Sequence, residues 1–288
     1  IAECVGAIRS KYPDIYLHWE DFARKNARRN LDRFKHEMCT FNDDMQGTGA
    51  TATACIMAGL KSMGQSLSEQ QIVFFGAGTA GVGIADQLFH VMVNSGMSEA
   101  AARERFWLID RVGLLFDDMD EVAPFQRPYV SRRYDDYGWG ALSDGPVTLL
   151  EVVERVKPTI LIGCSAVSGA FTQKVIEAMA AHCERPIIFP LSNPTSKAEA
   201  VPQDIINWSK GRAIVATGSP FSDALYDGRK VPVAQCNNAF IFPGLGLGVV
   251  ASKASRVTEG MIEAACHALS DHAPILTDPN EAVLPGFS

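Results

Sequence analysis

The sequence lacks a long uninterrupted hydrophobic run, which excludes a membrane-spanning helix. Its longest uncharged apolar stretch, residues 239–251, contains Pro243 and several glycines, and it is shorter than the ~20 apolar residues that cross a bilayer. Positive charge is also in the minority, since 26 lysines and arginines face 33 aspartates and glutamates, for a net charge of −7. Without a basic stripe, neither nucleic acid nor an anionic membrane is expected as a main partner.

Metal-finger spacing of cysteines is absent as well. The chain has seven cysteines in 288 residues, an odd and scattered set, so we expect reduced thiols in a cytoplasmic protein. No motif supports Cys4 or Cys39 as a nucleophile, and a buried, inert thiol is the better interpretation of each. The chain starts at an isoleucine in a helical pattern and shows no signal peptide, so we expect a piece of a longer protein.

What the sequence does contain is a glycine-rich turn between an apolar run and a helical pattern. Residues 72–75 (IVFF) have the composition of a strand that is buried on both faces. A G-x-G-x-x-G follows at residues 76–81, and the apolar residues at 84, 88, 91 and 92 then share one helix face. Strand, turn and helix in this order favour dinucleotide binding over a glycine-rich turn without a ligand.

The residues of this turn have separate expected roles toward a pyrophosphate. Gly76 permits the tight turn, Gly78 lets the phosphates approach the backbone, and Gly81 lets the helix pack close to the strand. The helix N-terminus, where Thr79 and Ala80 lie, offers free N–H groups and completes the expected phosphate site.

Asp110 ends the next apolar run, residues 106–110. An acid at the end of the second strand is expected to bind the adenosine ribose hydroxyls. Its separation from the glycines exceeds the usual ~20 residues, because a further helix is expected at residues 98–105. The alternative is an ordinary turn residue at a strand end. Arg111 could meet a 2′-phosphate, so the sequence favours NAD over NADP without settling the choice.

Apolar runs alternate with helical patterns along the chain, which predicts an α/β fold with a doubly wound, Rossmann-type parallel sheet and flanking helices. Strands are expected at residues 15–19, 72–75, 106–110, 159–163, 186–191 and 213–216. Helices are expected at residues 1–12, 26–35, 48–63, 98–105, 149–156, 171–182, 203–208 and 259–270, and from the glycine turn to about residue 95. Residues 116–146 are expected to form a surface excursion. We divide the chain into a leading helical and hinge segment, residues 1–40, and a dinucleotide-binding domain, residues 41–288.

Two pairs of adjacent carboxylates, Glu20-Asp21 and Asp43-Asp44, stand at the ends of expected elements. The first pair ends a strand, and α/β sheets bind ligands at the carboxyl ends of their strands. An acid before a helix can simply cap it, but one cap needs only one carboxylate, and adjacent unpaired acids repel. Oxygen ligands of this kind suit Mg²⁺ or Mn²⁺ and not zinc. From spacing alone, metal binding and capping are equally favoured.

Asparagines stand at two places where strands or helices are expected to begin or end. Asn193 follows the strand at residues 186–191, and Asn237 and Asn238 precede a glycine-rich helix start at residues 242–248. Such amides can cap a helix, form a turn, or hold a carboxylate and a carboxamide. Taken alone, the asparagine pair favours a turn.

Six motifs now occur in order along the chain. They are WEDF at 19–22, FNDDMQGT at 41–48, GAGTAGVGIA at 76–85, LSNPTSKAEA at 191–200, GSPF at 218–221 and QCNNAFIFPGLGLG at 235–248. Together they resemble the cofactor-binding domain of malic enzymes, most closely the bacterial NAD-dependent branch. The resemblance covers about residues 14–270, and the combination is far more specific than any one motif.

This resemblance implies NAD- and metal-dependent oxidative decarboxylation of (S)-malate to pyruvate and CO₂. It implies that Glu20, Asp21 and Asp44 hold Mg²⁺ or Mn²⁺. It further implies a catalytic role for Asp43, beside the catalytic lysine whose protonation it adjusts. It implies that Asn193 and Asn238 contact malate or the nicotinamide end, with Asn237 adjacent. It also implies that Gly76, Gly78 and Gly81 bind the pyrophosphate and that Asp110 binds the ribose.

The same resemblance implies that this chain is incomplete as an enzyme. In the family the base and the acid are a lysine and a tyrosine of an N-terminal substrate domain, which nothing before residue 14 supplies. We expect the full-length protein to form a homo-oligomer. Two other interpretations stay open: a malolactic enzyme of the same family, which converts malate to lactate, and a stand-alone dinucleotide-binding module with a regulatory or scaffolding role.

Overall fold

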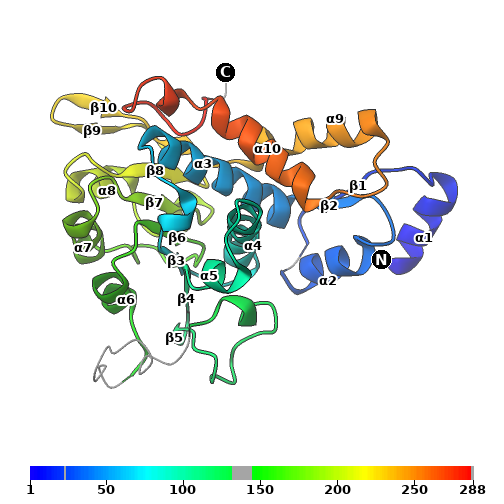
Figure 1. Cartoon of the computed structure of the whole chain (residues 1–288), viewed down its shortest axis with the longest axis horizontal. Coiled ribbons are helices and arrows are strands. Elements are labelled where there is room, and N and C mark those ends of the chain that lie inside the picture. The colour runs from blue at the N-terminus through cyan, green and yellow to red at the C-terminus, as the bar shows by residue number, and fades with distance from the viewer. Residues whose placement is uncertain (23, 132–144, 287–288) are drawn as a thin grey trace.

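The computed structural model describes residues 1–22, 24–131 and 145–286 as alternating strands and helices (Figure 1). The strands are β1 (Leu17–Trp19), β2 (Thr40–Asn42), β3 (Ile72–Phe75), β4 (Phe106–Asp110), β5 (Gly113–Leu114), β6 (Ile160–Gly163), β7 (Ile187–Pro190), β8 (Ile214–Thr217), β9 (Ala224–Tyr226), β10 (Arg229–Val231) and β11 (Ala234–Gln235). The helices are α1 (Ala2–Lys11), α2 (Arg24–Phe34), α3 (Thr48–Ser62), α4 (Thr79–Asn94), α5 (Glu99–Arg103), α6 (Leu149–Val156), α7 (Gln173–His182), α8 (Pro202–Trp208), α9 (Phe242–Ser252) and α10 (Glu259–Asp271). Among these residues, none of the helices combines the length and the apolar character needed to cross a bilayer.

The main sheet has seven strands in the order β11-β8-β7-β6-β3-β4-β5. Its neighbours pair in parallel, except that β5 is antiparallel to β4. The central strand β3 has Ile72 opposite Phe106 on one side and Ile160 on the other. The expectation of an α/β, doubly wound sheet is therefore confirmed, with one short antiparallel strand added at its edge.

Alternate side chains of the central strands pack against two different helix layers. Ile72 and Phe74 belong to the core that α3 and α4 cover, whereas Val73 and Leu161 belong to the core that α6, α7 and α8 cover. The two layers lie on opposite sides of the sheet in Figure 1. Because both faces are buried, these strands are continuous apolar runs in the sequence.

The strand order reverses at β3. The chain passes from β3 to β4 on one side and later returns to place β6 on the other side. In open α/β sheets such a switch point leaves a crevice at the carboxyl ends of the strands, where ligands bind. The glycine turn follows β3 directly, so it lies at this crevice.

The strand expected at residues 15–19 is present as β1 but does not join the main sheet, which corrects that expectation. It pairs in parallel with β2, so that Leu17 lies opposite Thr40 and Trp19 opposite Asn42. The Trp19 ring packs against Phe22 and Phe34, which gives this small sheet a core of its own. The pairing crosses residue 40, and the division of the chain at that point stays a prediction.

Five short strands were not expected from the sequence. They are β2 in the small sheet, β5 and β11 at the two edges of the main sheet, and the hairpin β9–β10, whose strands run antiparallel. Strands of two or three residues have too few positions to display an apolar period. Only the hairpin had a local signal in the sequence, the pair Asp227-Gly228, because Asp-Gly is typical of a tight hairpin turn. Both residues have the positive φ that this turn requires.

The surface excursion expected at residues 116–146 is wrong for its first half. Tyr129 and Val122 are each 4% exposed and belong to the main core. The Tyr129 ring contacts Phe89 and Phe106 edge-on, so this segment packs onto α4 and β4. Residues 132–144 lie outside the described residues.

One of the two cysteine expectations is also wrong. Cys39 is buried, but Cys4 is exposed. The reason is that α1 buries only Val5, so it lies on the surface as a largely solvated helix.

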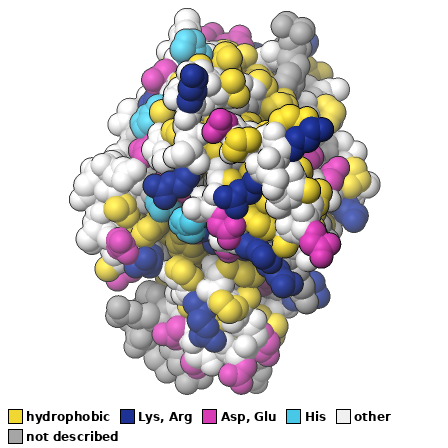
Figure 2. Space-filling view, turned by 90° about the vertical axis from the view of Figure 1, so that its right-hand side faces the viewer, with side chains coloured by type: hydrophobic (Ala, Val, Ile, Leu, Met, Phe, Trp, Pro, Cys, Tyr) yellow, Lys and Arg dark blue, Asp and Glu magenta, His cyan; other side chains and the backbone are white. Residues whose placement is uncertain are grey.

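The face that carries α1 and α9 displays charges of both signs. Figure 2 turns this face to the viewer and shows lysines and arginines interspersed with aspartates and glutamates among hydrophobic side chains. Leu247 and Val250 of α9 are 70% and 65% exposed. Among the described residues in this view, no continuous patch of one sign covers the face.

Candidate active site

The acidic side chains emerge from the carboxyl ends of the small parallel sheet. Glu20 and Asp21 follow β1, while Asp43 and Asp44 follow β2 and open a π-helical turn, Asp43–Gly47. Because β1 and β2 are parallel, their ends lie at one edge. Asn42 caps the turn, since its Oδ1 accepts a hydrogen bond from the Met45 N–H at 2.9 Å. Single-turn π-helical geometry is frequent at functional sites.

Glu20, Asp21 and Asp44 meet at one point. One carboxylate oxygen from each lies within 4.8 Å of the others. The Asp44 Oδ2 also accepts a hydrogen bond from the Asp21 N–H at 2.9 Å, which fixes the two loops against each other. Burial raises the pKa of Asp44, and this hydrogen bond opposes the increase.

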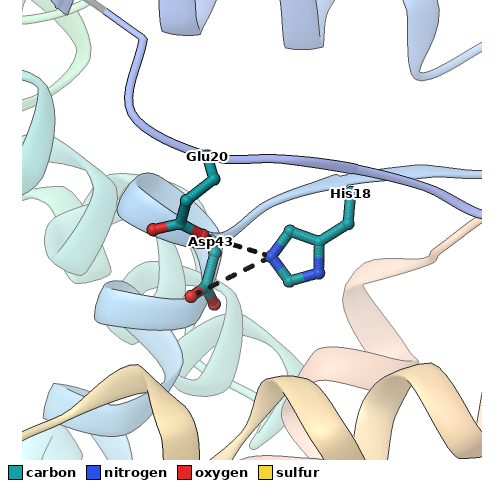
Figure 3. Close-up of side chains that lie close together, drawn as sticks. All are labelled: His18, Glu20 and Asp43. Atoms are coloured by element: carbon teal, nitrogen blue, oxygen red, sulfur yellow. Dashed lines mark ion pairs between the residues drawn. The ribbon is translucent and has the colours of Figure 1, made fainter.

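Asp43 and Glu20 both lie beside a histidine, His18 (Figure 3). His18 Nε2 is 3.4 Å from Glu20 Oε2 and 3.9 Å from Asp43 Oδ2. The Asn238 amide donates a 2.5 Å hydrogen bond to Asp43 Oδ2. Burial, reinforced by the negative charges of Glu20 and Asp44, raises the pKa of Asp43 to about 7.

A divalent cation fits this arrangement. Asp43 is only 2% exposed, and its Oδ1 has no hydrogen-bond partner among the described residues. Buried carboxylate oxygens without a partner are costly, and so is the mutual repulsion of neighbouring carboxylates. A hard cation held by the oxygen atoms of Glu20, Asp21 and Asp44 would relieve that repulsion.

Two of the acids, Asp21 and Asp44, line a cleft of about 490 Å³ together with the start of α4 and the ends of two strands. The cleft is lined by Asp21, Phe22, Ala27, Asp44, Met45, Thr48, Thr79, Ala80, Cys164, Ala166, Leu191, Ser192 and Asn193. Five residues expected in the site are therefore together in one cavity: Asp21, Asp44, Thr79, Ala80 and Asn193.

The glycine turn has the close contacts that its residue types predict. Gly76 has a φ of +103°, and a Cβ there would lie 2.4 Å from the carbonyl carbon of Cys164. A Cβ on Gly81 would lie 2.3 Å from the carbonyl oxygen of Gly76. Gly78 is the N-cap of α4, which starts at Thr79. The N-terminus of α4 thus opens toward the cleft, as binding of a phosphate requires.

Asp110 lies at the carboxyl end of β4, one strand away from the glycine turn. Its Oδ1 accepts a hydrogen bond from the Arg111 N–H at 2.8 Å, and its Oδ2 accepts one from Gln126 Nε2 at 3.1 Å. Gln126 also donates to the carbonyl oxygen of Ala77 at 2.7 Å. No sequence signal pointed to Gln126, which lies 16 positions from its acidic partner.

The three expected asparagines have different surroundings. Asn193 lines the cleft, and its Oδ1 accepts a hydrogen bond from Ser219 Oγ. Asn238 contacts Asp43, as described above. Asn237 caps a short turn, since its Oδ1 accepts a hydrogen bond from the Ala239 N–H at 2.9 Å. The turn that the sequence favoured for the asparagine pair is therefore present, and Asn237 caps it.

Glu199 is a further functional candidate that sequence reasoning missed. It is fully buried, and it accepts hydrogen bonds from Ser165 N, Ser165 Oγ and Ser192 Oγ at 2.8, 2.8 and 2.5 Å. Since Ser165 follows β6 and Ser192 follows β7, this carboxylate joins the two strand ends that line the cleft. A Cβ on Gly163 would lie 2.5 Å from Glu199 Cδ, which explains why β6 ends in glycine.

His18 was also missed, although its spacing offered a signal. It precedes Glu20 by two positions, and residues two apart in a strand share a face. His18 therefore projects to the same side as Glu20, toward Asp43.

Comparison with known proteins adds independent findings. A family model described as malic enzyme, NAD binding domain, matches residues 45–288. The NAD-dependent malic enzyme of Pseudomonas aeruginosa is 48% identical over 283 residues, which cover 98% of this chain and 50% of that relative. The enzyme of the same name from Salmonella paratyphi B is 48% identical over 287 residues, which cover 100% and 51%.

A solved structure is similar over the same extent. The crystal structure of malic enzyme from Pyrococcus horikoshii superimposes with a TM-score of 0.75 at 25% identity, and it covers 99% of this chain and 60% of that chain. This chain spans about half the length of the curated relatives it matches.

Proposed function

The chain belongs to the malic enzyme family, and we propose that it supplies the NAD- and metal-binding part of an enzyme that oxidatively decarboxylates (S)-malate to pyruvate and CO₂. One observation carries the proposal. Oxygen atoms of Glu20, Asp21 and Asp44 lie within 4.8 Å of one another, and Asp21 and Asp44 line the cleft that the start of α4 and Asn193 also line. A hard cation and a dinucleotide can therefore both bind next to one substrate molecule in this cleft.

On the metal side, Glu20, Asp21 and Asp44 hold Mg²⁺ or Mn²⁺. The bound ion supplies Lewis-acid stabilisation of negative charge on the substrate oxygens. Asp43 adjusts the protonation of a lysine that the rest of the full-length protein contributes. Its buried position and its hydrogen bond to Asn238 support this role, because they hold the carboxylate still beside the acidic cluster.

On the nucleotide side, the glycine turn and the start of α4 bind the pyrophosphate, and Asp110 binds the ribose hydroxyls. The amides near the cleft hold the nicotinamide carboxamide and the malate carboxylate. The residues assigned to these contacts are Gly76, Gly78, Thr79, Ala80, Gly81, Asp110, Asn193, Asn237 and Asn238.

The proposal extends to the setting of the full-length protein. We propose a leading segment at residues 1–40 that carries two metal ligands, a dinucleotide-binding domain at residues 41–288, and a substrate domain elsewhere in the polypeptide. We further propose a homo-oligomer that works in the cytoplasm and has no nucleic-acid partner.

Kinetics of the full-length protein test the reaction. With (S)-malate, NAD and Mn²⁺, we expect pyruvate and NADH to form in equal amounts, with neither product when the metal is chelated. Lactate without net NADH would indicate the malolactic reaction instead. Absence of any malate-dependent product with either dinucleotide and either metal would contradict the proposal.

The metal ligands are tested by Asp44→Ala in the same full-length protein. We expect this variant to lose most of the activation by Mn²⁺, because one of three oxygen ligands is gone. Asp14→Ala, which removes an exposed carboxylate outside the cleft, is the matched control and should keep wild-type activation. An unchanged Mn²⁺ titration in Asp44→Ala would show that the ligand assignment is wrong.

A further inference from the structure

We propose that Gln126 is a specificity-determining residue that makes the nucleotide site prefer a free ribose 2′-hydroxyl over a 2′-phosphate. It does so by fixing the carboxylate of Asp110 beside the glycine turn. This inference rests on the proposed function, because it assumes that Asp110 faces the adenosine ribose.

The amide of Gln126 joins two parts of the expected nucleotide site to the segment that carries it. Its Nε2 donates to Asp110 Oδ2 at 3.1 Å and to the carbonyl oxygen of Ala77, inside the glycine turn, at 2.7 Å. Its Oε1 accepts a hydrogen bond from the Ala123 N–H at 2.8 Å. Every polar atom of this side chain therefore has a partner, and the side chain is only 6% exposed.

The segment that carries Gln126 is itself firmly held. The Tyr129 hydroxyl donates a hydrogen bond to Asp86 Oδ1 of α4 at 2.7 Å. Two residues later, Ser131 forms a β-bridge with Phe116. The other oxygen of Asp86 forms an ion pair with Arg28 at 3.0 Å. The amide of Gln126 is thus fixed relative to α4 and, through Ala77, relative to the glycine turn.

A carboxylate held in one orientation discriminates between the two nucleotides. It can accept hydrogen bonds from ribose hydroxyls, and its negative charge repels a 2′-phosphate at the same place. A carboxylate that is free to turn loses part of both effects, because it can move away from the phosphate and no longer aims its oxygens at the hydroxyls. Arg111, the next residue in the chain, would then be the nearer charge for a 2′-phosphate.

The experiment measures binding of NAD and NADP to the full-length protein by calorimetry. For Gln126→Leu we expect NAD to bind about tenfold more weakly, the usual effect of losing one hydrogen bond to a charged group, while NADP binding is unchanged or stronger. The NAD preference, taken as the ratio of the two dissociation constants, should fall about tenfold or more. Gln126→Glu, which keeps the shape but replaces the donor by a second negative charge, should also lower NAD binding.

Gln70→Leu is the matched control. Gln70 is 3% exposed and donates a hydrogen bond to the Ser66 carbonyl oxygen at 2.8 Å, away from the cleft. It carries the same substitution at similar burial, so it reports the effect of a general loss of stability. We expect this variant to keep the wild-type preference, and thermal denaturation of all three variants checks that they fold.

Two results would overturn the inference, and they differ from failure of the proposed function. The preference could stay at the wild-type value in Gln126→Leu, including the case in which both nucleotides weaken equally, or the wild-type protein could bind NADP as well as NAD. In each case the wild-type protein still binds a dinucleotide, and the proposed function stands. A wild-type protein that binds neither nucleotide would instead contradict the proposed function itself.

Discussion

Asp43 is the residue whose environment departs most from what its type prefers. This carboxylate is 2% exposed and close to two other acids, and one of its oxygens has no partner among the described residues. It is therefore destabilised in its charged form. The hydrogen bond from the Asn238 amide opposes this effect but does not offset it, and the pKa stays raised to about 7. The strain follows from gathering acids at one point, which a cation site requires.

This raised pKa makes stability depend on pH in a definite direction. Between the ordinary value of 3.8 and about 7, the folded chain keeps a proton on Asp43 that the unfolded chain has released. The contribution of this proton to the free energy of unfolding is therefore fully present below about pH 4, and this contribution is lost as the pH rises to about 7. Asp43→Asn cannot titrate, so urea unfolding in the presence of a chelator should show a smaller loss of stability from about pH 5 to about pH 8 than in wild type.

The same experiment has a clear control and a clear contradiction. Asp14→Asn alters an exposed carboxylate and should keep the wild-type dependence on pH. Equal losses in wild type and Asp43→Asn would show that Asp43 is ionised in the folded chain at pH 5.

At the residue scale, the sequence singled out acids that the fold brings close together, but it missed the partners of other buried polar side chains. Glu20, Asp21 and Asp44 stood out because adjacent acids at element ends are unusual. Gln126 and Glu199 did not, because a buried glutamine or glutamate looks like any surface residue in a sequence. Their value depends on donors and acceptors that only the folded chain brings near.

At the scale of the element, the glycine turn after β3 is constrained by contact more than by backbone conformation. Gly76 and Gly96 have nearly the same φ, +103° and +102°. A Cβ on Gly76 would lie 2.4 Å from Cys164, whereas a Cβ on Gly96 would have no neighbour within 4 Å. Alanine at either position would carry a similar backbone strain, but only alanine at position 76 would also overlap with a neighbour. Comparing the two substitutions therefore separates the two effects.

We expect Gly96→Ala to lower the free energy of unfolding by about 1–2 kcal/mol, the cost of a left-handed conformation for a residue with a Cβ. Gly76→Ala should cost clearly more, because the turn must also move away from β6, and it should abolish dinucleotide binding that Gly96→Ala retains. Denaturant unfolding and calorimetric titration with NAD measure the two effects. Similar losses in both variants would mean that the turn adapts and that contact with Cys164 is unimportant.

Element prediction succeeded where the periodicity was long and failed where strands were short. The long apolar runs of β3, β4 and β6 were visible because both sheet faces are buried. In contrast, β2 spans only Thr40–Asn42, and its pairing with β1 joins residues 23 positions apart in sequence. No local pattern encodes such a pairing, so nothing in the sequence indicated β2, and β1 was grouped with the strands of the main sheet.

At the scale of the whole molecule, the cleft offers ligands but no proton-transfer lysine or tyrosine. Among the described residues that line it, neither type occurs. Oxidation of an alcohol and protonation of an enolate both need such groups. For the 288-residue chain alone we therefore expect weak NAD binding and negligible malate turnover, measured by calorimetry and by NADH absorbance. Robust Mn²⁺-dependent NADH production by this chain would contradict the expectation.

The sequence by itself determined the alternation of strands and helices, the position of the glycine turn and the identity of the acids. These features are local, because apolar periodicity and the steric demands of a turn are properties of a few neighbouring residues. Only the tertiary structure decided which residues meet: Asn238 bonds to Asp43 across 195 positions, and Gln126 bonds to the glycine turn across 49. Such contacts depend on how whole helices and strands pack, since distance along the chain sets no distance in space.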